Sequence, residues 1–331
     1  MRLSVIIPVY NAQSYLNKCL DSVFCQDLLP SQFEVIAIND GSTDATLEIL
    51  NTYKNKYPNL IVLSQENKGE AETRNRAIDI AKGKYIAFVD SDDSVKSNTF
   101  TTILDKAEKL NLDILYLNMS LYDEKGIFLY QYPSVGVENT VLNGFDHPRR
   151  TFPATLYRTE LAKKFKFRKE IIIGPDTVFN TMVQSFSKRC SYISIPHYNY
   201  THRDDSLSKQ SSSEKAYNGF LNAIEILVNF QSKEFSSKSL NQKKYFDSVL
   251  ILFMTRIIEN NILPTFDKKR VLELKKLLNN LDINYLSDEI STKFNYFNSN
   301  YIIFFGYNKI LNFKQLIYFT AHTIKNKLKK I

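Results

Sequence analysis

Four short runs of apolar, mostly β-branched residues occur near the start of the chain, and a helical pattern separates each run from the next. Strand–helix–strand units of this length build a parallel sheet with helices on its faces. We therefore predict an α/β fold with a mostly parallel, twisted sheet flanked by helices. We expect the first strand to end at Pro8, which has no amide proton for a sheet ladder. The apolar runs lie at 3–10, 33–38, 60–63 and 84–89, and the helices between them are expected at 16–24, 44–57 and 71–81.

The rest of the chain divides into a mixed part and a helical part. Residues 94–208 combine helical and strand patterns, and 206–214 is a polar, serine-rich stretch typical of a linker. From residue 215 onward the pattern is helical. We predict a catalytic domain over 1–208, with halves at about 1–93 and 94–208, followed by a helical C-terminal region over 209–331.

The net charge of +8 is unevenly distributed. Residues 1–93 carry 9 Lys and Arg against 13 Asp and Glu, whereas the remainder carries 34 against 22. A basic surface suits nucleic acid, a membrane surface or an anionic substrate. No nucleic-acid recognition motif accompanies the charge, so we predict no nucleic-acid partner.

The cysteines and the hydropathy pattern bear on the compartment. Cys19, Cys25 and Cys190 have neither metal-binding nor redox spacing, and their odd number does not suggest a disulfide framework. The first residues look like a strand rather than a signal peptide, and no run of 18 apolar residues occurs. We expect a cytoplasmic protein, with the cytoplasmic face of the membrane as an alternative location.

Three carboxylates follow the fourth predicted strand, in the sequence Asp90-Ser91-Asp92-Asp93. They repel one another unless a cation lies among them, and hard oxygen ligands suit Mg²⁺ or Mn²⁺. Such a cation would also allow an anionic diphosphate to approach. We predict Asp92 and Asp93 as ligands of Mn²⁺ or Mg²⁺. The alternative is that these acids cap the next helix.

Two further polar segments follow predicted strands. Asp40 closes the second strand, where its carboxylate suits a base or ribose, although Asp-Gly-Ser also makes a good turn. Gly69 permits a close backbone approach before a helix whose N-terminus favours phosphate. Arg74 suits a donor contact or, alternatively, a salt bridge with a nearby carboxylate. The chain lacks a P-loop, and it lacks the glycine-rich loop expected of a sugar nucleotidyltransferase.

These segments together resemble the family 2 glycosyltransferases, the large inverting group with a GT-A fold. The resemblance covers residues 3–93 strongly and 94–208 weakly. It rests on four motifs in the expected order and spacing: Ser4 to Asn11, Ile38 to Asp44, Asn67-x-Gly69 with Ala71-x-x-Arg74-Asn75, and Gly83 to Asp93.

The resemblance implies a role for each matching position. Asp92 would hold the metal, and the segment 173–179 would supply the general base, for which Asp176 is the candidate. The other interpretation of Asp176 is an N-cap of a helix over 177–187, and the two roles need not exclude each other. Glu170 is the second candidate for the base. Arg203, in Tyr198-x-Tyr200-x-x-Arg203, would fold over the diphosphate. The implied nucleotide-sugar ligands are Pro8, Tyr10, Asn11, Asp40, Lys68, Gly69, Arg74, Asp90, Ser91 and Arg203.

The function predicted from this resemblance is an inverting transfer of one sugar. The donor would be a nucleotide diphosphate sugar, with UDP as the expected nucleotide. The acceptor would be a hydroxyl of a glycan or a lipid-linked intermediate in polysaccharide biosynthesis. The alternative is a non-catalytic, nucleotide-sugar-binding subunit, because Pro175 stands where the family usually has Glu.

The C-terminal segment has a basic, amphipathic pattern. After Glu289 the sequence has no acidic residue and seven lysines, and apolar residues recur at helical spacing from Ile310 to Ile331. Such a helix over 301–331 would make peripheral contact with a membrane surface. The alternative is a helix that packs on the catalytic domain, with its lysines in water.

Overall fold

The computed structural model describes residues 1–132, 140–144, 152–203, 212–234, 240–262 and 268–280. The predicted basic helix over 301–331 and most of the predicted linker at 206–214 lie outside the described residues. Among the described residues, no helix is both long enough and apolar enough to cross a membrane.

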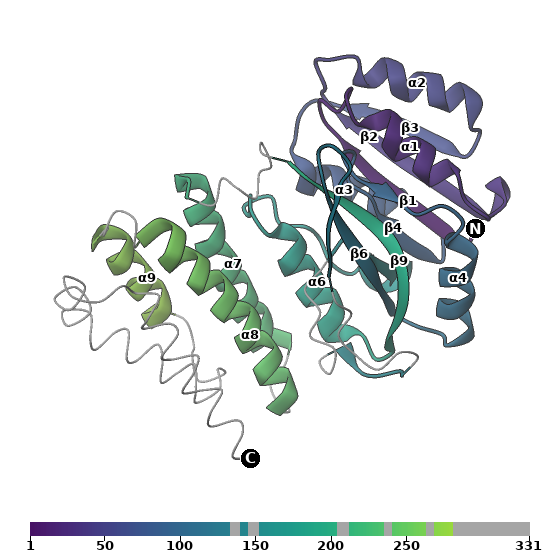
Figure 1. Cartoon of the computed structure of the whole chain (residues 1–331). Helices are drawn as coiled ribbons and strands as arrows, with labels where there is room; N and C mark the ends of the chain where they lie inside the picture. Colours follow the sequence, from purple (N-terminus) through teal and green to yellow (C-terminus); the bar gives the residue numbers. More distant parts are fainter. Residues whose placement is uncertain (133–139, 145–151, 204–211, 235–239, 263–267, 281–331) are drawn as a thin grey trace.

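A single twisted sheet organises the described part of the chain (Figure 1). Its strand order is β3-β2-β1-β4-β8-β6-β9-β5, with β7 paired to β6. The parallel strands are β1 (Leu3–Val9), β2 (Phe33–Asp40), β3 (Leu60–Gln65), β4 (Tyr85–Phe88), β6 (Ile114–Asp123) and β9 (Cys190–His202). The antiparallel strands are β5 (Ser94–Val95), β7 (Phe128–Tyr132) and β8 (Thr155–Arg158). The predicted α/β class and mostly parallel sheet are confirmed.

Helices cover both faces of this sheet (Figure 1). One face carries α1 (Leu16–Phe24), α2 (Thr46–Lys56) and α4 (Phe100–Lys109), and a short 3₁₀ turn, η1 (Pro30–Gln32), leads into β2. The other face carries α3 (Glu70–Ile80), α5 (Thr159–Ala162) and α6 (Pro175–Phe186). Because side chains alternate along a strand, the parallel strands between the two helical layers are mostly apolar on both sides.

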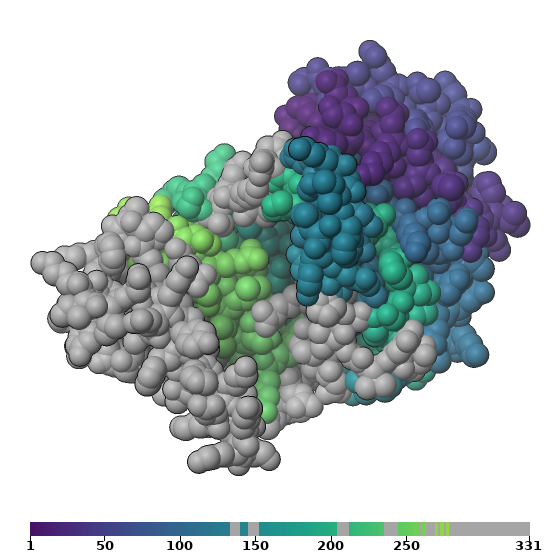
Figure 2. Space-filling model, in the orientation of Figure 1, coloured from purple at the N-terminus to yellow at the C-terminus, as the bar shows by residue number. Residues whose placement is uncertain are grey.

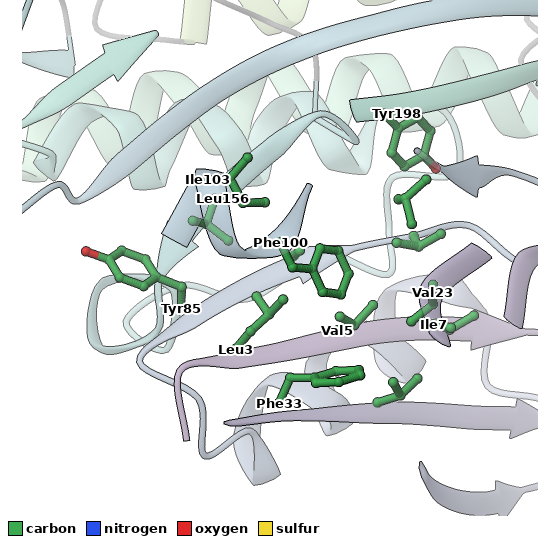
Figure 3. Close-up of a cluster of buried hydrophobic side chains, with 14 of the residues drawn as sticks. Leu3, Val5, Ile7, Val23, Phe33, Tyr85, Phe100, Ile103, Leu156 and Tyr198 are labelled. Carbon is green, nitrogen blue, oxygen red and sulfur yellow. The ribbon is translucent and has the colours of Figure 1, made fainter. Parts of the chain in front are cut away.

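The first core shows this alternation clearly. Leu3, Val5 and Ile7 of β1 point toward α1 and α4, where Phe33 and Phe100 meet edge to face with ring centroids 5.8 Å apart (Figure 3). Ile6 belongs instead to the core on the opposite face. A one-residue slip of β1 would exchange these two sets, so the packing fixes the strand register.

An aromatic cluster fills the core beneath α6. Phe167 and Phe179 stack with ring centroids 4.1 Å apart, and Phe88 contacts both rings edge to face. Phe152 lies 4.7 Å from Phe88. Aromatic pairs of this kind each contribute about 0.5–1.5 kcal/mol beyond their burial. The cluster therefore anchors the start of α6, and so the position of Asp176, to the end of β4.

A third core lies between α6 and the helices that follow β9. These are α7 (Glu214–Glu234), α8 (Leu240–Ile257), the π-helical turn η4 (Ile258–Ile262) and α9 (Lys268–Asn280). Figures 1 and 2 show α7 and α8 at the end of the molecule opposite α1 and α2. The helical pattern predicted from residue 215 is present in the described residues, whereas the division at residue 208 stays a prediction.

The expectation that the first strand ends at Pro8 was wrong. Pro8 lies inside β1, paired in register with Ile38 of β2. On its other side β1 pairs with β4 only as far as Ile6. The missing amide proton of Pro8 therefore costs no sheet hydrogen bond, because the β4 ladder has already ended.

Candidate active site

The predicted site residues gather at one edge of the sheet. β1, β2, β4 and β9 all run in the same direction, so their carboxyl ends meet there. The N-termini of α3 and α6 point to this edge as well, because each helix runs antiparallel to the strands it covers. In open α/β sheets, ligands bind beyond the carboxyl ends of the strands.

The carboxylate of Asp40 is buried at the end of β2 and accepts three hydrogen bonds from protein donors. Oδ1 accepts hydrogen bonds from Gln65 Nε2 at 2.7 Å and from the Lys68 amide at 2.9 Å. Oδ2 accepts one from the Gly69 amide at 2.8 Å. Asp40 therefore fixes the loop that enters α3.

Gly41 belongs to the same turn and makes close packing possible. Its φ is +74°, and a Cβ atom there would lie 2.8 Å from the amide nitrogen of Asn67. Glycine is therefore needed both for the backbone conformation and for the approach of the neighbouring loop. The predicted turn at Asp-Gly-Ser is therefore present, and the Asp40 side chain holds the neighbouring loop from within it.

The loops after β1 and β2 are tied together. The amide of Asn11, which has a φ of +47°, donates to Ser42 Oγ at 2.9 Å, and Asn11 Oδ1 accepts from the Thr43 amide at 2.8 Å. Pro8 is buried, whereas 52% of Tyr10 is exposed. Tyr10 therefore offers an aromatic surface to a ligand, while Pro8 and Asn11 shape the backbone around it.

Arg74 of α3 is buried among carboxylates and aromatic rings. Its Nη2 lies 2.6 Å from Asp90 Oδ1 and 2.6 Å from Glu70 Oε1. The guanidinium carbon lies 5.0 Å from the ring centre of Phe152 and 5.3 Å from that of Phe167. The carboxylates hold the pKa of Arg74 above its ordinary value despite burial. Of the two roles predicted for Arg74, the structure therefore shows the salt bridge with nearby carboxylates.

Asp176 lies in the first turn of α6. Gly174, with a φ of +84°, is the N-cap residue, and Pro175 takes the first helical position. The expectation that Asp176 caps a helix over 177–187 was therefore wrong, because proline is favoured at the position after the cap and starts α6 two residues earlier. Burial raises the pKa of Asp176, and the nearby charge of Arg74 opposes that rise.

Asp93 joins the acid cluster to β9. Its Oδ2 accepts a hydrogen bond from Tyr198 Oη at 2.6 Å, and its Oδ1 accepts one from the Thr201 amide at 2.8 Å. Tyr198 Oη also accepts a hydrogen bond from the Asp90 amide at 3.1 Å. Burial, together with the charges of Asp90 and Asp92, raises the pKa of Asp93 well above its ordinary value.

Asp92 forms an ion pair with Arg203, the residue that follows β9. Arg203 Nη2 lies 2.7 Å from Asp92 Oδ2, and the two side chains are 21% and 25% exposed, respectively. The guanidinium carbon lies 4.8 Å from the ring centre of Tyr15. The structure thus places Arg203 directly against the predicted metal ligand.

The acids at 90–93 are the oxygen ligands that a divalent cation prefers, but their carboxylates already face partners within the protein. Asp90 forms an ion pair with Arg74, and Asp92 forms one with Arg203. Both carboxylate oxygens of Asp93 accept hydrogen bonds from the protein. No cluster of three acidic, histidine or cysteine side chains suited to a metal occurs among the described residues. The alternative, that these acids cap the next helix, was wrong because α4 begins at Phe100 with Thr99 as its N-cap.

Sequence reasoning missed several residues of this site. Tyr198 was part of a quoted motif, but nothing in the sequence pairs its hydroxyl with Asp93. No sequence motif or spacing pointed to Tyr15 or Glu70.

The remaining predicted residues lie at the surface or near it. Lys68 is exposed, and Ser91 is half-buried beside the acid cluster. Glu170, the second candidate for the base, is exposed in a surface groove between α3 and residues 166–170, which we call the α3 groove.

The chain belongs to glycosyl transferase family 2, whose family model matches residues 4–184. The fold is also found in solved structures. The structure of Staphylococcus aureus TarS 1–349 in complex with UDP-GlcNAc superimposes with a TM-score of 0.70 at 23% identity, over 90% of this chain and 88% of that one. This likeness confirms the predicted GT-A fold.

Curated relatives match about half to two thirds of the chain. The poly(ribitol-phosphate) beta-glucosyltransferase of Bacillus spizizenii is 32% identical over 211 residues, which make up 62% of this chain and 33% of that protein. The uncharacterized glycosyltransferase YibD of Escherichia coli is 35% identical over 54% of this chain and 52% of its own. The chain therefore spans about a third to a half of the length of these relatives.

Replacing Asp40 with Asn tests its loop-holding role. Asn offers one oxygen in place of two, so the amide of Gly69 would face an NH₂ group instead of an acceptor. A buried donor left without its partner costs about 1–3 kcal/mol. We expect Asp40→Asn to lower the free energy of unfolding by that amount in urea denaturation.

The control for this variant is Asp105→Asn, since Asp105 is an exposed partner of Arg2. The control should stay within about 0.5 kcal/mol of the wild type. An Asp40→Asn protein that unfolds at the same urea concentration as the wild type would show that these buried hydrogen bonds do not hold the loop.

Proposed function

We propose that the chain catalyses an inverting sugar transfer from a UDP-sugar to a hydroxyl of a glycan or lipid-linked acceptor in polysaccharide biosynthesis. One observation carries the proposal. The end of β4, the start of α3 and the start of α6 bring Asp90, Arg74 and Asp176 within electrostatic reach of one another at the ligand-binding edge.

The names of the relatives support the donor and the acceptor class. TarS has been solved with UDP-GlcNAc and with UDP, and the latter structure superimposes with a TM-score of 0.68. The Bacillus relative is named for poly(ribitol-phosphate) as its acceptor polymer. We carry over to this chain a UDP-sugar as donor and a polymer as the acceptor class.

The donor side of the site is proposed to form around three residues and the loop 67–69. Tyr10 presents its ring and Asp40 holds the loop 67–69, so the nucleoside would bind between them. Arg203 lies where a diphosphate would pass the ends of β4 and β9. A guanidinium binds two phosphate oxygens at once, and it stabilises the negative charge that develops on the leaving group.

The acceptor side is proposed to use Asp176 as general base. The acceptor hydroxyl gives its proton to Asp176 while its oxygen forms a bond to the anomeric carbon. The bond from that carbon to the diphosphate oxygen breaks, and UDP leaves with the electron pair. One in-line displacement inverts the anomeric configuration, so no covalent sugar–enzyme intermediate is needed.

We further propose that turnover requires Mn²⁺ or Mg²⁺, held through Asp92. When bound, such a cation would neutralise the diphosphate charge. Asp93 is the weaker candidate ligand, because both of its oxygens are used to hold Tyr198 and Thr201. The predicted cytoplasmic location stays a prediction.

A non-catalytic binding subunit is the second candidate function. It was suggested by Pro175, which replaces a Glu that the family usually has. Pro175 is favourable as the first residue of α6, and it leaves Asp176 in the first turn near Arg74. The position of Asp176 therefore favours catalysis over binding alone.

The role of Asp176 is tested by Asp176→Asn, which removes the base but keeps its shape. We expect transfer from UDP-sugar to acceptor to fall by about 10²- to 10⁴-fold, the usual contribution of general base catalysis. UDP affinity, measured by calorimetry, should stay within about twofold, since the base acts on the acceptor hydroxyl.

The matched control is Glu170→Gln, which removes the exposed carboxylate of the other candidate base and should leave transfer unchanged. Loss of transfer in Glu170→Gln but not in Asp176→Asn would reassign the base. A wild-type protein that binds UDP but transfers no sugar from any UDP-sugar would favour the binding subunit.

The pH profile of transfer tests the environment of Asp176. A general base works deprotonated, so the rate falls as pH drops through its pKa. Burial raises that pKa and Arg74 lowers it, so we expect an acid limb above the ordinary Asp range. In Arg74→Gln the opposing charge is gone, and the acid limb should move to higher pH. An unchanged limb would show that Arg74 does not act on the base.

A further inference from the structure

The hairpin formed by β6 and β7 exposes a run of large apolar side chains. The four residues at 127–130, which we call the hairpin tip, are each between 49% and 58% exposed. They are Ile127, Phe128, Leu129 and Tyr130. Figure 2 shows the hairpin on the near face of the molecule. Single exposed apolar residues are ordinary, whereas a contiguous patch marks a contact with another molecule or with a membrane.

A tight turn holds the hairpin tip in this exposed position. Asp123 Oδ1 accepts hydrogen bonds from the amides of Lys125 at 3.0 Å and Ile127 at 2.7 Å. The amide of Gly126, which has a φ of +81°, donates to the carbonyl oxygen of Asp123 at 3.0 Å. The exposed side chains therefore extend from a hydrogen-bonded backbone, and their exposure is built into the fold.

Both faces of the hairpin carry apolar side chains. Tyr122 pairs with Phe128 across the hairpin, and their rings meet edge to face with centroids 5.8 Å apart. Leu121 pairs with Tyr130, which contacts Tyr132 and so lies on the face of the first core. Because consecutive side chains of β6 point to opposite faces, Phe128 and Tyr130 do so as well. A flat protein partner would cover only one of these faces, whereas lipid would surround both.

The hairpin turn lies at the sheet edge that carries the candidate active site. β6 is parallel to β9, so both strands run toward this edge. Their pairing continues to the last residue of β6, where Asp123 lies opposite His202. Arg203 is the next residue of the chain. A surface that holds the hairpin would therefore also hold this edge of the sheet.

Charge distinguishes among the possible partners of the hairpin tip. Residues 127–132 carry no charge, and Glu124 and Lys125 in the turn carry opposite charges, whereas residues 94–331 carry 34 Lys and Arg against 22 Asp and Glu. Nucleic acid or an anionic substrate would match the positive charge but would leave the apolar tip in water. An anionic bilayer matches both features, because its headgroups attract cations and its interior takes up apolar side chains. We propose that the hairpin tip inserts into the surface of a lipid bilayer.

Insertion brings the candidate active site to the membrane surface. The hydroxyl of a lipid-linked acceptor would then reach Asp176 while its lipid stays in the bilayer, whereas a free glycan would gain nothing from the hairpin tip. The docking itself is independent of the proposed function. The preference for a lipid-linked acceptor over a free glycan rests on that function.

The docking is tested by cosedimentation of the full chain with vesicles of equal parts phosphatidylglycerol and phosphatidylcholine. The wild type should bind these vesicles. Leu129→Ser keeps the aromatic pair of the hairpin but removes one apolar side chain from the tip, and it should weaken partitioning about tenfold. The matched control is Leu29→Ser, since Leu29 is 65% exposed before η1, at the opposite edge of the sheet. The control should bind like the wild type, and circular dichroism shows whether each variant is folded.

A fluorescent probe shows whether the tip itself enters the lipid. The chain contains no Trp, so Phe128→Trp introduces a single indole at the tip. Its emission should shift to shorter wavelength when vesicles are added, and lipids brominated on their acyl chains should quench it. Leu29→Trp should show neither effect.

The proposal is overturned if the wild type does not bind vesicles, or if Leu129→Ser binds them equally well. Unchanged emission from Phe128→Trp would also overturn it, since any binding would then come from another part of the chain. A dimer without lipid that Leu129→Ser dissociates, together with absent vesicle binding, would assign the tip to a second copy instead. Failure of the proposed function would appear differently, as absent sugar transfer by a protein that binds vesicles through the tip.

Discussion

The buried guanidinium of Arg74 is the interaction on which the rest of this site depends. It lies between Glu70 and Asp90, both at 2.6 Å from Nη2, and against the rings of Phe152 and Phe167. An uncompensated charge of this kind would be very costly to bury, and these carboxylates and aromatic faces make it tolerable. The cation in turn allows acidic groups from α3 and β4 to lie close together at one sheet edge. Among the described residues, its Nε has no hydrogen-bond partner, so Arg74 is held by its ion pairs and ring contacts rather than by a full set of hydrogen bonds.

The strands and helices around Arg74 place the predicted site residues on two sides of its guanidinium. In the proposed function, Asp40 and the loop before α3 form the donor side, and α6 brings Asp176 to the acceptor side. Tyr198 links the two halves of the sheet, because its hydroxyl contacts Asp93 and the Asp90 amide while its ring packs in the first core (Figure 3). The acids to which the proposed chemistry is assigned therefore also hold the fold together, since each one has a partner inside the protein.

Much of the architecture could be predicted from the sequence, because the first half repeats a strong local pattern. The strands before Asp40 and Asp90 are short, β-branched and apolar on both faces, so their ends and the polar clusters beyond them could be located. The antiparallel strands β7 and β8 were not predicted, since they are short and their pairing with β6 and β4 depends on distant residues. For the same reason the sequence suggested a role for Arg203 but not its pairing with Asp92. A contact between side chains about a hundred residues apart leaves no periodic signal.

The most direct test of this account is a crystal structure of the chain with UDP and Mn²⁺. The account predicts the nucleoside between Tyr10 and the loop held by Asp40, the diphosphate against Arg203, and Asp176 facing the open end of the diphosphate. UDP bound in the α3 groove, or at the sheet edge without any contact to Arg203 or to the loop 67–69, would contradict it.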